Sequence, residues 1–118
     1  MYLCLMYSKE LIKGTLQTII LKLLSEHEKM YGYEITQKVK ELSDGKIAIT
    51  EGALYPTLHR LEAEGLLSTE KVNIGKRVRK YYMLTAQGNE TASSKVTEFQ
   101  EFMHTMKFLL SPKSQTAL

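Results

Sequence analysis

The sequence reads EGALYPTLHRLEAEGLL over residues 51–67 and, shortly afterwards, KVNIGKRVRKYYMLT over residues 71–85. The first stretch has apolar side chains at the spacing of a helix face, namely Leu54, Leu58 and Leu61. The second stretch changes to strand-like alternation around Gly75, which favours two strands joined by a tight turn. A compact helix that leads directly into a positively charged hairpin is typical of a winged helix-turn-helix module, mainly α with a small β-wing.

The helix has suitable residues at both ends. Thr50 can cap the N-terminus by accepting a backbone hydrogen bond, and Gly65 tolerates the left-handed conformation that often follows a helix C-terminus. Pro56 lacks the amide proton that a regular helix would offer to the carbonyl of Gly52. We therefore expect a loosened first turn.

Two further helices are predicted upstream. The first can be capped by Ser8 or Thr15 and has one continuous apolar face, formed by Leu16, Ile19, Ile20, Leu23 and Leu24. The second ends at residues 43–45, and its buried side is expected to comprise Tyr31, Ile35, Val39 and Leu42. The run over residues 46–50 alternates and predicts one short strand.

The hairpin is predicted as a strand over residues 67–72, a turn over residues 73–76 and a return strand over residues 77–84. One face of the return strand is expected to carry Val78, Tyr82 and Leu84, and the other Arg77, Arg79 and Tyr81. Guanidinium groups on an exposed face can bond to phosphate oxygens or enter a narrow minor groove of DNA.

Positive charge is concentrated on this hairpin. The chain has 118 residues, 16 of them Lys or Arg, and a net charge of +3. Five cations and no acid lie between residues 71 and 80, namely Lys71, Lys76, Arg77, Arg79 and Lys80. One explanation is a solvated hairpin edge that charge protects from aggregation, and the other is a phosphate-binding surface.

The remaining composition fits one globular domain and gives no sign of catalysis. Cys4 is alone, so no intramolecular disulfide can form and we expect a cytoplasmic protein. The histidines lie far from one another and from Cys4, and no catalytic triad or phosphate loop is present. We therefore expect no metal, no cofactor and no enzyme. The apolar residues 1–7 are too short for a signal peptide or a membrane span, and we interpret them as a packing segment.

The C-terminal segment, residues 85–110, has a separate helical pattern. Its apolar residues repeat as a heptad seam, Ala92, Val96, Phe99, Met103, Met106 and Leu110, which Phe102 and Leu109 widen. A second copy of the chain is the expected cover for this stripe, and folding back onto the first helix is the alternative. We accordingly expect a winged-helix domain over residues 1–88 and a dimerisation helix with its tail over residues 89–118.

Four motifs resemble the PadR-type transcriptional regulators. They are G-T-L at residues 14–16, G-Y-E-I at residues 32–35, the helix motif at residues 52–67 and R-x-R-K-Y-Y-x-L-T at residues 77–85. They occur in the order and at the separations usual for that family, and the similarity extends over residues 11–88.

The resemblance implies a dimeric repressor whose third helix enters the major groove of a pseudo-palindromic double-stranded operator, with the wing on the flanking backbone or minor groove. The positions that this assigns to DNA binding are Thr50, Glu51, Ala53 and Tyr55 on the helix and Lys76, Arg77, Arg79 and Lys80 on the wing. Tyr55 could instead be half-buried packing. His59 and Arg60 could also contact DNA, although Arg60 could equally pair with Glu62, Glu64 or a residue of the second helix.

The resemblance also implies a homodimer joined through Val96, Phe99, Phe102, Met103, Met106 and Leu110, and a possible small hydrophobic or aromatic effector. Phe99, Phe102, Met103, Met106 and Tyr2 could line an effector pocket, but packing alone also explains them. A winged-helix module for protein–protein contacts is the alternative function. The absence of acids among the wing cations favours DNA.

Overall fold

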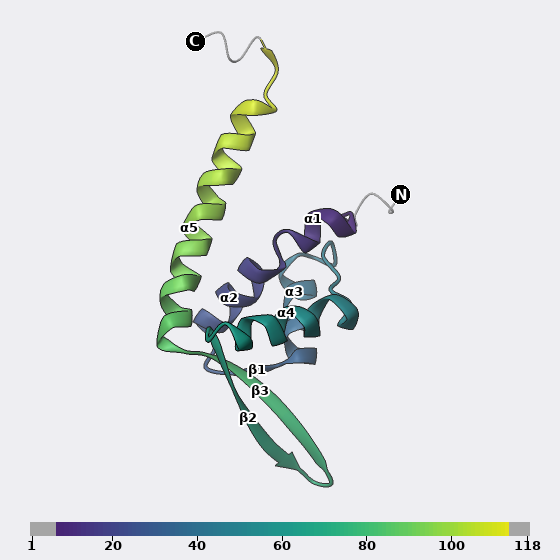
Figure 1. Cartoon of the computed structure of the whole chain (residues 1–118). Helices are drawn as coiled ribbons and strands as arrows, with labels where there is room; N and C mark the ends of the chain where they lie inside the picture. The colour runs from purple at the N-terminus through teal and green to yellow at the C-terminus, as the bar shows by residue number, and fades with distance from the viewer. Residues whose placement is uncertain (1–6, 114–118) are drawn as a thin grey trace.

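The structure, a computed structural model, describes residues 7–113. In this part of the chain it contains five helices and three strands (Figure 1). They are α1 (Lys9–Lys13), α2 (Leu16–Glu26), β1 (Met30–Tyr31), α3 (Gly32–Leu42), α4 (Glu51–Ala63), β2 (Leu67–Ile74), β3 (Arg77–Leu84) and α5 (Ala86–Leu109). This is the predicted winged helix-turn-helix architecture with a long C-terminal helix.

The core lies among α2, α3, α4 and the base of the hairpin. The predicted apolar faces of α2 and α4 are buried, apart from the half-buried Ile19. On α3, Ile35 and Val39 are buried, but the prediction for Leu42 is wrong, because this last residue of the helix extends beyond the core and is 69% exposed. Val78 is also exposed, because the hairpin projects past the core at that point.

Two local predictions before α4 are wrong. Residues 46–50 form no strand, because no neighbouring strand offers them hydrogen bonds; the alternation reflects only the inward packing of Ile47 and Ile49. At the N-terminal end, Ser8 caps the separate helix α1, whereas Thr15 precedes α2 and bonds backward to the carbonyl of Ile12.

Helix α4 is regular in spite of Pro56. The Thr50 hydroxyl accepts a hydrogen bond from the Ala53 amide at 3.2 Å, which confirms the predicted cap. The expected loosening of the first turn is absent, since α4 runs without interruption from Glu51 to Ala63. Gly52 is exposed in the first turn, so water can bond to the carbonyl that Pro56 leaves without a donor.

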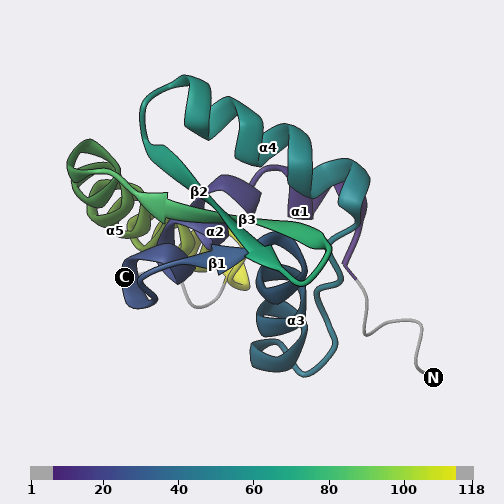
Figure 2. The ribbon, with the colours of Figure 1, turned by 90° about the horizontal axis from the view of Figure 1, so that it is seen from below.

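The sheet has the order β1-β3-β2 and is antiparallel throughout. Strand β2 continues to Ile74, two residues further than predicted, so the turn consists of Gly75, with φ 62°, and Lys76. Strand β1 was not predicted, and it pairs only with Tyr81 and Tyr82 of β3. Residues 77–80 of β3 therefore pair with β2 alone. Figure 2 shows β3 between β1 and β2, with α4 and α3 on either side of the hairpin.

Helix α5 starts at a close junction with the end of α4. The Thr85 hydroxyl donates to the carbonyl of Gly65 at 2.7 Å and accepts from the amide of Gly88 at 3.0 Å. The N-terminal half of α5 packs against α2, and its C-terminal half extends away from the core, opposite to the hairpin (Figure 1). No helix within residues 7–113 combines the length and apolar character needed to cross a membrane.

Gly88→Ala should destabilise the fold, because the new Cβ would collide with the carbonyl oxygen of Leu66 and lie 3.1 Å from a methyl group of Leu84. We expect a loss of about 1–3 kcal/mol in the free energy of unfolding, as for other overpacked sites. Gly14→Ala is the matched control, since its nearest neighbours are 3.9 Å away. Thermal unfolding of both variants checks this, and equal stability would contradict the close packing at Gly88.

Tyr82 predicts a loss of stability at alkaline pH. Burial raises the pKa of this 2% exposed phenol, and the nearby Glu62 raises it further. In the unfolded chain tyrosine ionises near pH 10, so between that pH and the higher folded pKa only the unfolded state releases the proton. The free energy of unfolding should therefore fall above about pH 10 in the wild type and fall less in Tyr82→Phe. Urea unfolding at about pH 8 and pH 11 tests this; parallel losses in both proteins would exclude Tyr82 as the cause.

Candidate nucleic-acid interface

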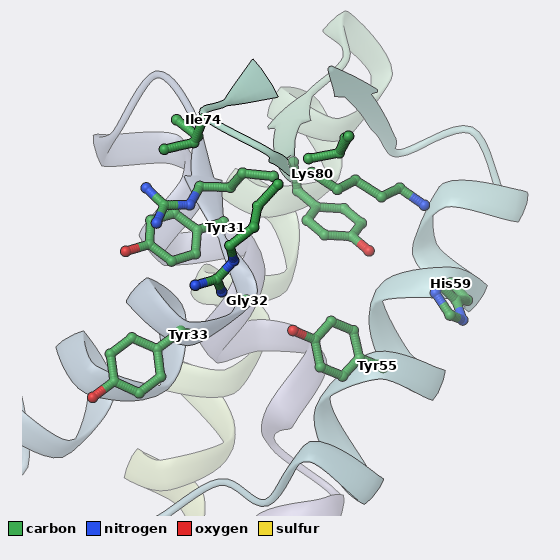
Figure 3. A pocket seen from close by; sticks show the side chains of 11 residues that line it. Tyr31, Gly32, Tyr33, Tyr55, His59, Ile74 and Lys80 are labelled. Atoms are coloured by element: carbon green, nitrogen blue, oxygen red, sulfur yellow. The ribbon is translucent and has the colours of Figure 1, made fainter. Parts of the chain in front are cut away.

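A groove opens between α4, the start of α3 and the wing, which comprises β2, β3 and their turn (Figure 3). We call it the wing groove. It has a volume of about 720 Å³ and is lined by four tyrosines, three cations, His59 and smaller side chains. The tyrosines are Tyr31, Tyr33, Tyr55 and Tyr82, and the cations are Arg77, Arg79 and Lys80. A concave surface with both aromatic rings and positive charge can accept a polyanion with stacked bases.

Helix α4 forms one wall of the wing groove. Tyr55 and His59 are one helical turn apart, with ring centroids separated by 6.3 Å. Tyr55 is half-buried and packs on the core, and its hydroxyl approaches Gly32 so closely that no Cβ would fit there. The packing alternative for Tyr55 is therefore confirmed, and its ring also lines the wing groove, while the DNA contact stays a prediction.

The N-terminal end of α4 is accessible. Thr50, Glu51 and Ala53 are all exposed at this end. Glu51 lies in the first helical turn, where a carboxylate is stabilised by the helix dipole. Arg60 is directed elsewhere: its guanidinium donates to Gln17 of α2 at 3.1 Å and lies 3.8 Å from Glu64. The structure thus places Arg60 outside the wing groove, in agreement with the pairing alternative for this residue.

The five wing cations fall into two groups. Within residues 7–113, Lys71, Lys76 and Arg77 are exposed and have no ion pair or side-chain hydrogen bond; we call them the free wing cations. Arg79 and Lys80 both have partners inside the protein. Sequence alone could not separate these groups, because Tyr31 and Glu62, the partners that hold Arg79 and Lys80 to the core, come from other elements.

Lys80 connects the wing to α4. Its ammonium lies 3.7 Å from a carboxylate oxygen of Glu62 and 5.4 Å from the ring centroid of Tyr82. Glu62 also accepts a hydrogen bond from Thr69 of β2 at 3.4 Å. Both strands of the wing therefore contact the same carboxylate on α4.

Arg79 connects the opposite face of the wing to the start of α3. Its guanidinium carbon lies 4.0 Å from the ring centroid of Tyr31, the residue directly before α3. Hydrogen bonding to the Tyr81 side chain raises the pKa of Arg79, with smaller contributions from Tyr31 and Glu34. The guanidinium stays charged, but its face is covered by an aromatic ring.

Sequence reasoning missed two residues of this site, Tyr31 as a partner for Arg79 and Tyr33. Tyr33 is 62% exposed and lines the wing groove from the first turn of α3 (Figure 3). The only sequence signal for Tyr33 is an aromatic residue on the polar side of an otherwise amphipathic helix. Among the described residues, no group of three or more His, Cys, Asp or Glu side chains is arranged to hold a metal ion.

The predicted dimer seam is only partly covered within one chain. Ala92 is buried, and Val96, Phe99 and Met106 are half-buried. Phe102, Met103, Phe108, Leu109 and Leu110 are exposed, with Leu110 at 75%. Folding back onto α2 therefore accounts for the first half of α5 and leaves the second half without cover. Cys4 and Tyr2 lie outside the described residues.

The three-helix core, the α4 wall and the basic hairpin define a winged-helix protein. The chain belongs to the transcriptional regulator PadR-like family, whose pattern it matches over residues 20–94. Among solved structures, it is similar to a transcriptional regulator from Clostridium thermocellum, with a TM-score of 0.79 and 30% identity over 89% of this chain and 99% of that one. A PadR family transcriptional regulator from Eggerthella lenta is 32% identical, with a TM-score of 0.76 and 88% of each chain covered.

A relative found by sequence similarity is also described as a transcriptional regulator. The transcriptional regulator Rv3488 of Mycobacterium tuberculosis is 38% identical over 80 residues, which cover 68% of this chain and 71% of the relative. The chain is thus a transcriptional regulator of the PadR family, and its family supports the prediction that it is not an enzyme.

Proposed function

We propose that this chain acts as a homodimeric repressor that binds a pseudo-palindromic DNA operator through α4 and the wing. The observation that carries the proposal is that the free wing cations Lys71, Lys76 and Arg77 are exposed and unpaired on the wing that borders, together with α4, the wing groove. Unpaired cations gain most from phosphate, because no existing ion pair must be broken. Repression by occlusion needs only DNA binding, so it is the outcome that we assign.

Within this proposal the residues have separate roles. Thr50, Glu51, Ala53 and the Tyr55 ring face the major groove, and His59 lies further along the same wall. The cations at the wing tip contact the flanking phosphates. Few of these side chains form the bidentate pairs that read single bases, so we assign much of the selectivity to DNA shape.

Dimerisation is supported by the uncovered half of α5. Five large apolar side chains are exposed in this half of the helix, and a second copy would bury them. Two winged cores would then contact half-sites about 34 Å apart, one turn of DNA. Phe99 and Phe102 line a groove of about 280 Å³ beside α2, at the lower end of ligand-pocket sizes, so packing accounts for them better than a small hydrophobic or aromatic effector.

The direct test is binding of purified protein to a duplex with the DNA upstream of its own gene, over a salt series and against an unrelated duplex. Arg77→Ala should weaken binding to both duplexes and lower the salt slope by about one per subunit. Lys40→Ala is the matched control and should leave the slope unchanged, because Lys40 is an exposed cation on α3 that has no ion pair and lies outside the wing groove. Absence of salt-sensitive binding by the wild type would favour the protein-interaction function instead.

The dimer is tested by Met103→Glu. A carboxylate in the α5 seam would be buried without a partner, so the dimer dissociation constant should rise at least about tenfold and operator binding should be lost. Gln100→Glu, an exposed change on the same helix, should keep the dimer. Light scattering over a concentration series measures this, and an intact Met103→Glu dimer would place the interface elsewhere.

A further inference from the structure

The wing is held on both faces by cations that belong to its basic patch. Lys80 reaches Glu62 of α4 on one face, and Arg79 reaches Tyr31 on the other. The two contacts differ in geometry, because the Lys80 pair joins partly exposed groups 3.7 Å apart, whereas Arg79 places a planar guanidinium 4.0 Å from a ring centroid, which allows fewer orientations. Arg79 is thus the better-defined contact between the wing and the helical core.

The geometry of the sheet explains how Arg79 meets Tyr31. Tyr31 of β1 pairs with Tyr81 of β3, so their side chains share a face and their rings meet edge to face at 5.5 Å. Arg79 lies two residues before Tyr81 on the same face, one step beyond the end of β1. Its side chain therefore continues the aromatic cluster at the point where β3 loses its second neighbouring strand.

The contact between Arg79 and Tyr31 connects the wing to α4 through a short series of neighbouring residues. The Tyr31 amide donates to Glu34 at 3.1 Å, which fixes the start of α3. Gly32, the next residue, packs directly against the Tyr55 hydroxyl of α4. Arg79 is thus linked to the α4 wall of the wing groove by two contacts, one to Tyr31 and one from Gly32 to Tyr55. The peptide bond between Tyr31 and Gly32 joins them.

We infer that Arg79 is a positioning residue, which sets the angle between the wing and α4 by stacking on Tyr31, while the free wing cations supply the phosphate contacts. The inference rests on the proposed function for its consequence, namely that Arg79 controls discrimination between operator and other DNA. A correctly angled wing and α4 can fit one duplex together, whereas a loose wing still contacts any phosphate backbone.

The angle is measured first without DNA. Spin labels at Lys76→Cys on the wing turn and Ala63→Cys on α4, in a Cys4→Ser background and diluted with unlabelled protein, report the distance distribution between wing and helix. We expect a narrow distribution in the parent and in Arg77→Ala, and a broader one in Arg79→Ala and Tyr31→Leu. Tyr31→Phe keeps the ring and should restore the narrow distribution. Equal widths in all variants would overturn the inference.

DNA-binding measurements then distinguish a positioning role of Arg79 from a direct contact between its charge and phosphate. Arg79→Ala should weaken operator binding roughly 2- to 30-fold per subunit, the range for one cation–π contact, and leave the salt slope unchanged. Arg77→Ala should lower the slope. Arg79→Lys retains the charge but not the planar group, so it should not recover full affinity. A reduced slope in Arg79→Ala would show that Arg79 is a phosphate contact.

Failure of the proposed function gives a different result. If the wild type binds no DNA in a salt-sensitive way, the regulator proposal fails, but the spin-label widths still decide whether Arg79 positions the wing. Circular dichroism of each variant confirms that the helices are intact. Tyr31→Phe and Arg79→Lys keep the inference testable if the larger changes prevent folding.

Discussion

The arrangement of α4, the wing and α5 depends on one backbone group, the carbonyl of Leu66. It accepts the Thr85 amide at 3.0 Å and the Thr85 hydroxyl at 3.2 Å, and Gly88 packs against its oxygen. The end of α4, the base of the wing and the start of α5 therefore meet within a few residues. Because these contacts are to backbone atoms, they fix directions that side-chain packing alone would leave free to vary.

The wing shows how a basic patch can have two physical uses. Cations that pair within the protein lose part of their attraction for an outside anion, but they hold the strand in place. Cations without partners retain that attraction. The division follows from position along β3: Arg79 and Lys80 are within reach of β1 and α4, whereas Arg77 lies beyond both. A count of charges in the sequence cannot reveal it.

Sequence patterns predicted the elements that depend on local physics. The leucine stripe of α4, the Thr50 cap, the positive φ of Gly75 and the length of α5 all follow from spacing and residue type. Features that depend on distant partners were not predictable. Strand β1 has two residues and exists only because β3 lies beside it, and Tyr31 meets Arg79 across 48 positions of chain. The run over residues 46–50 failed for the opposite reason, since it has the alternation but no neighbour.

The length of α5 has a mechanical consequence. Its 24 residues make a rod of about 36 Å, rooted at the winged core and uncovered at its far end. For two chains joined at those far ends, a change of about 5° in the angle between the rods would move one core relative to the other by about 3 Å, close to the rise of one base pair. In such a dimer the stiffness of the joint between the rods, and not only the chemistry of the wing, would set how much the distance between the two DNA half-sites can vary.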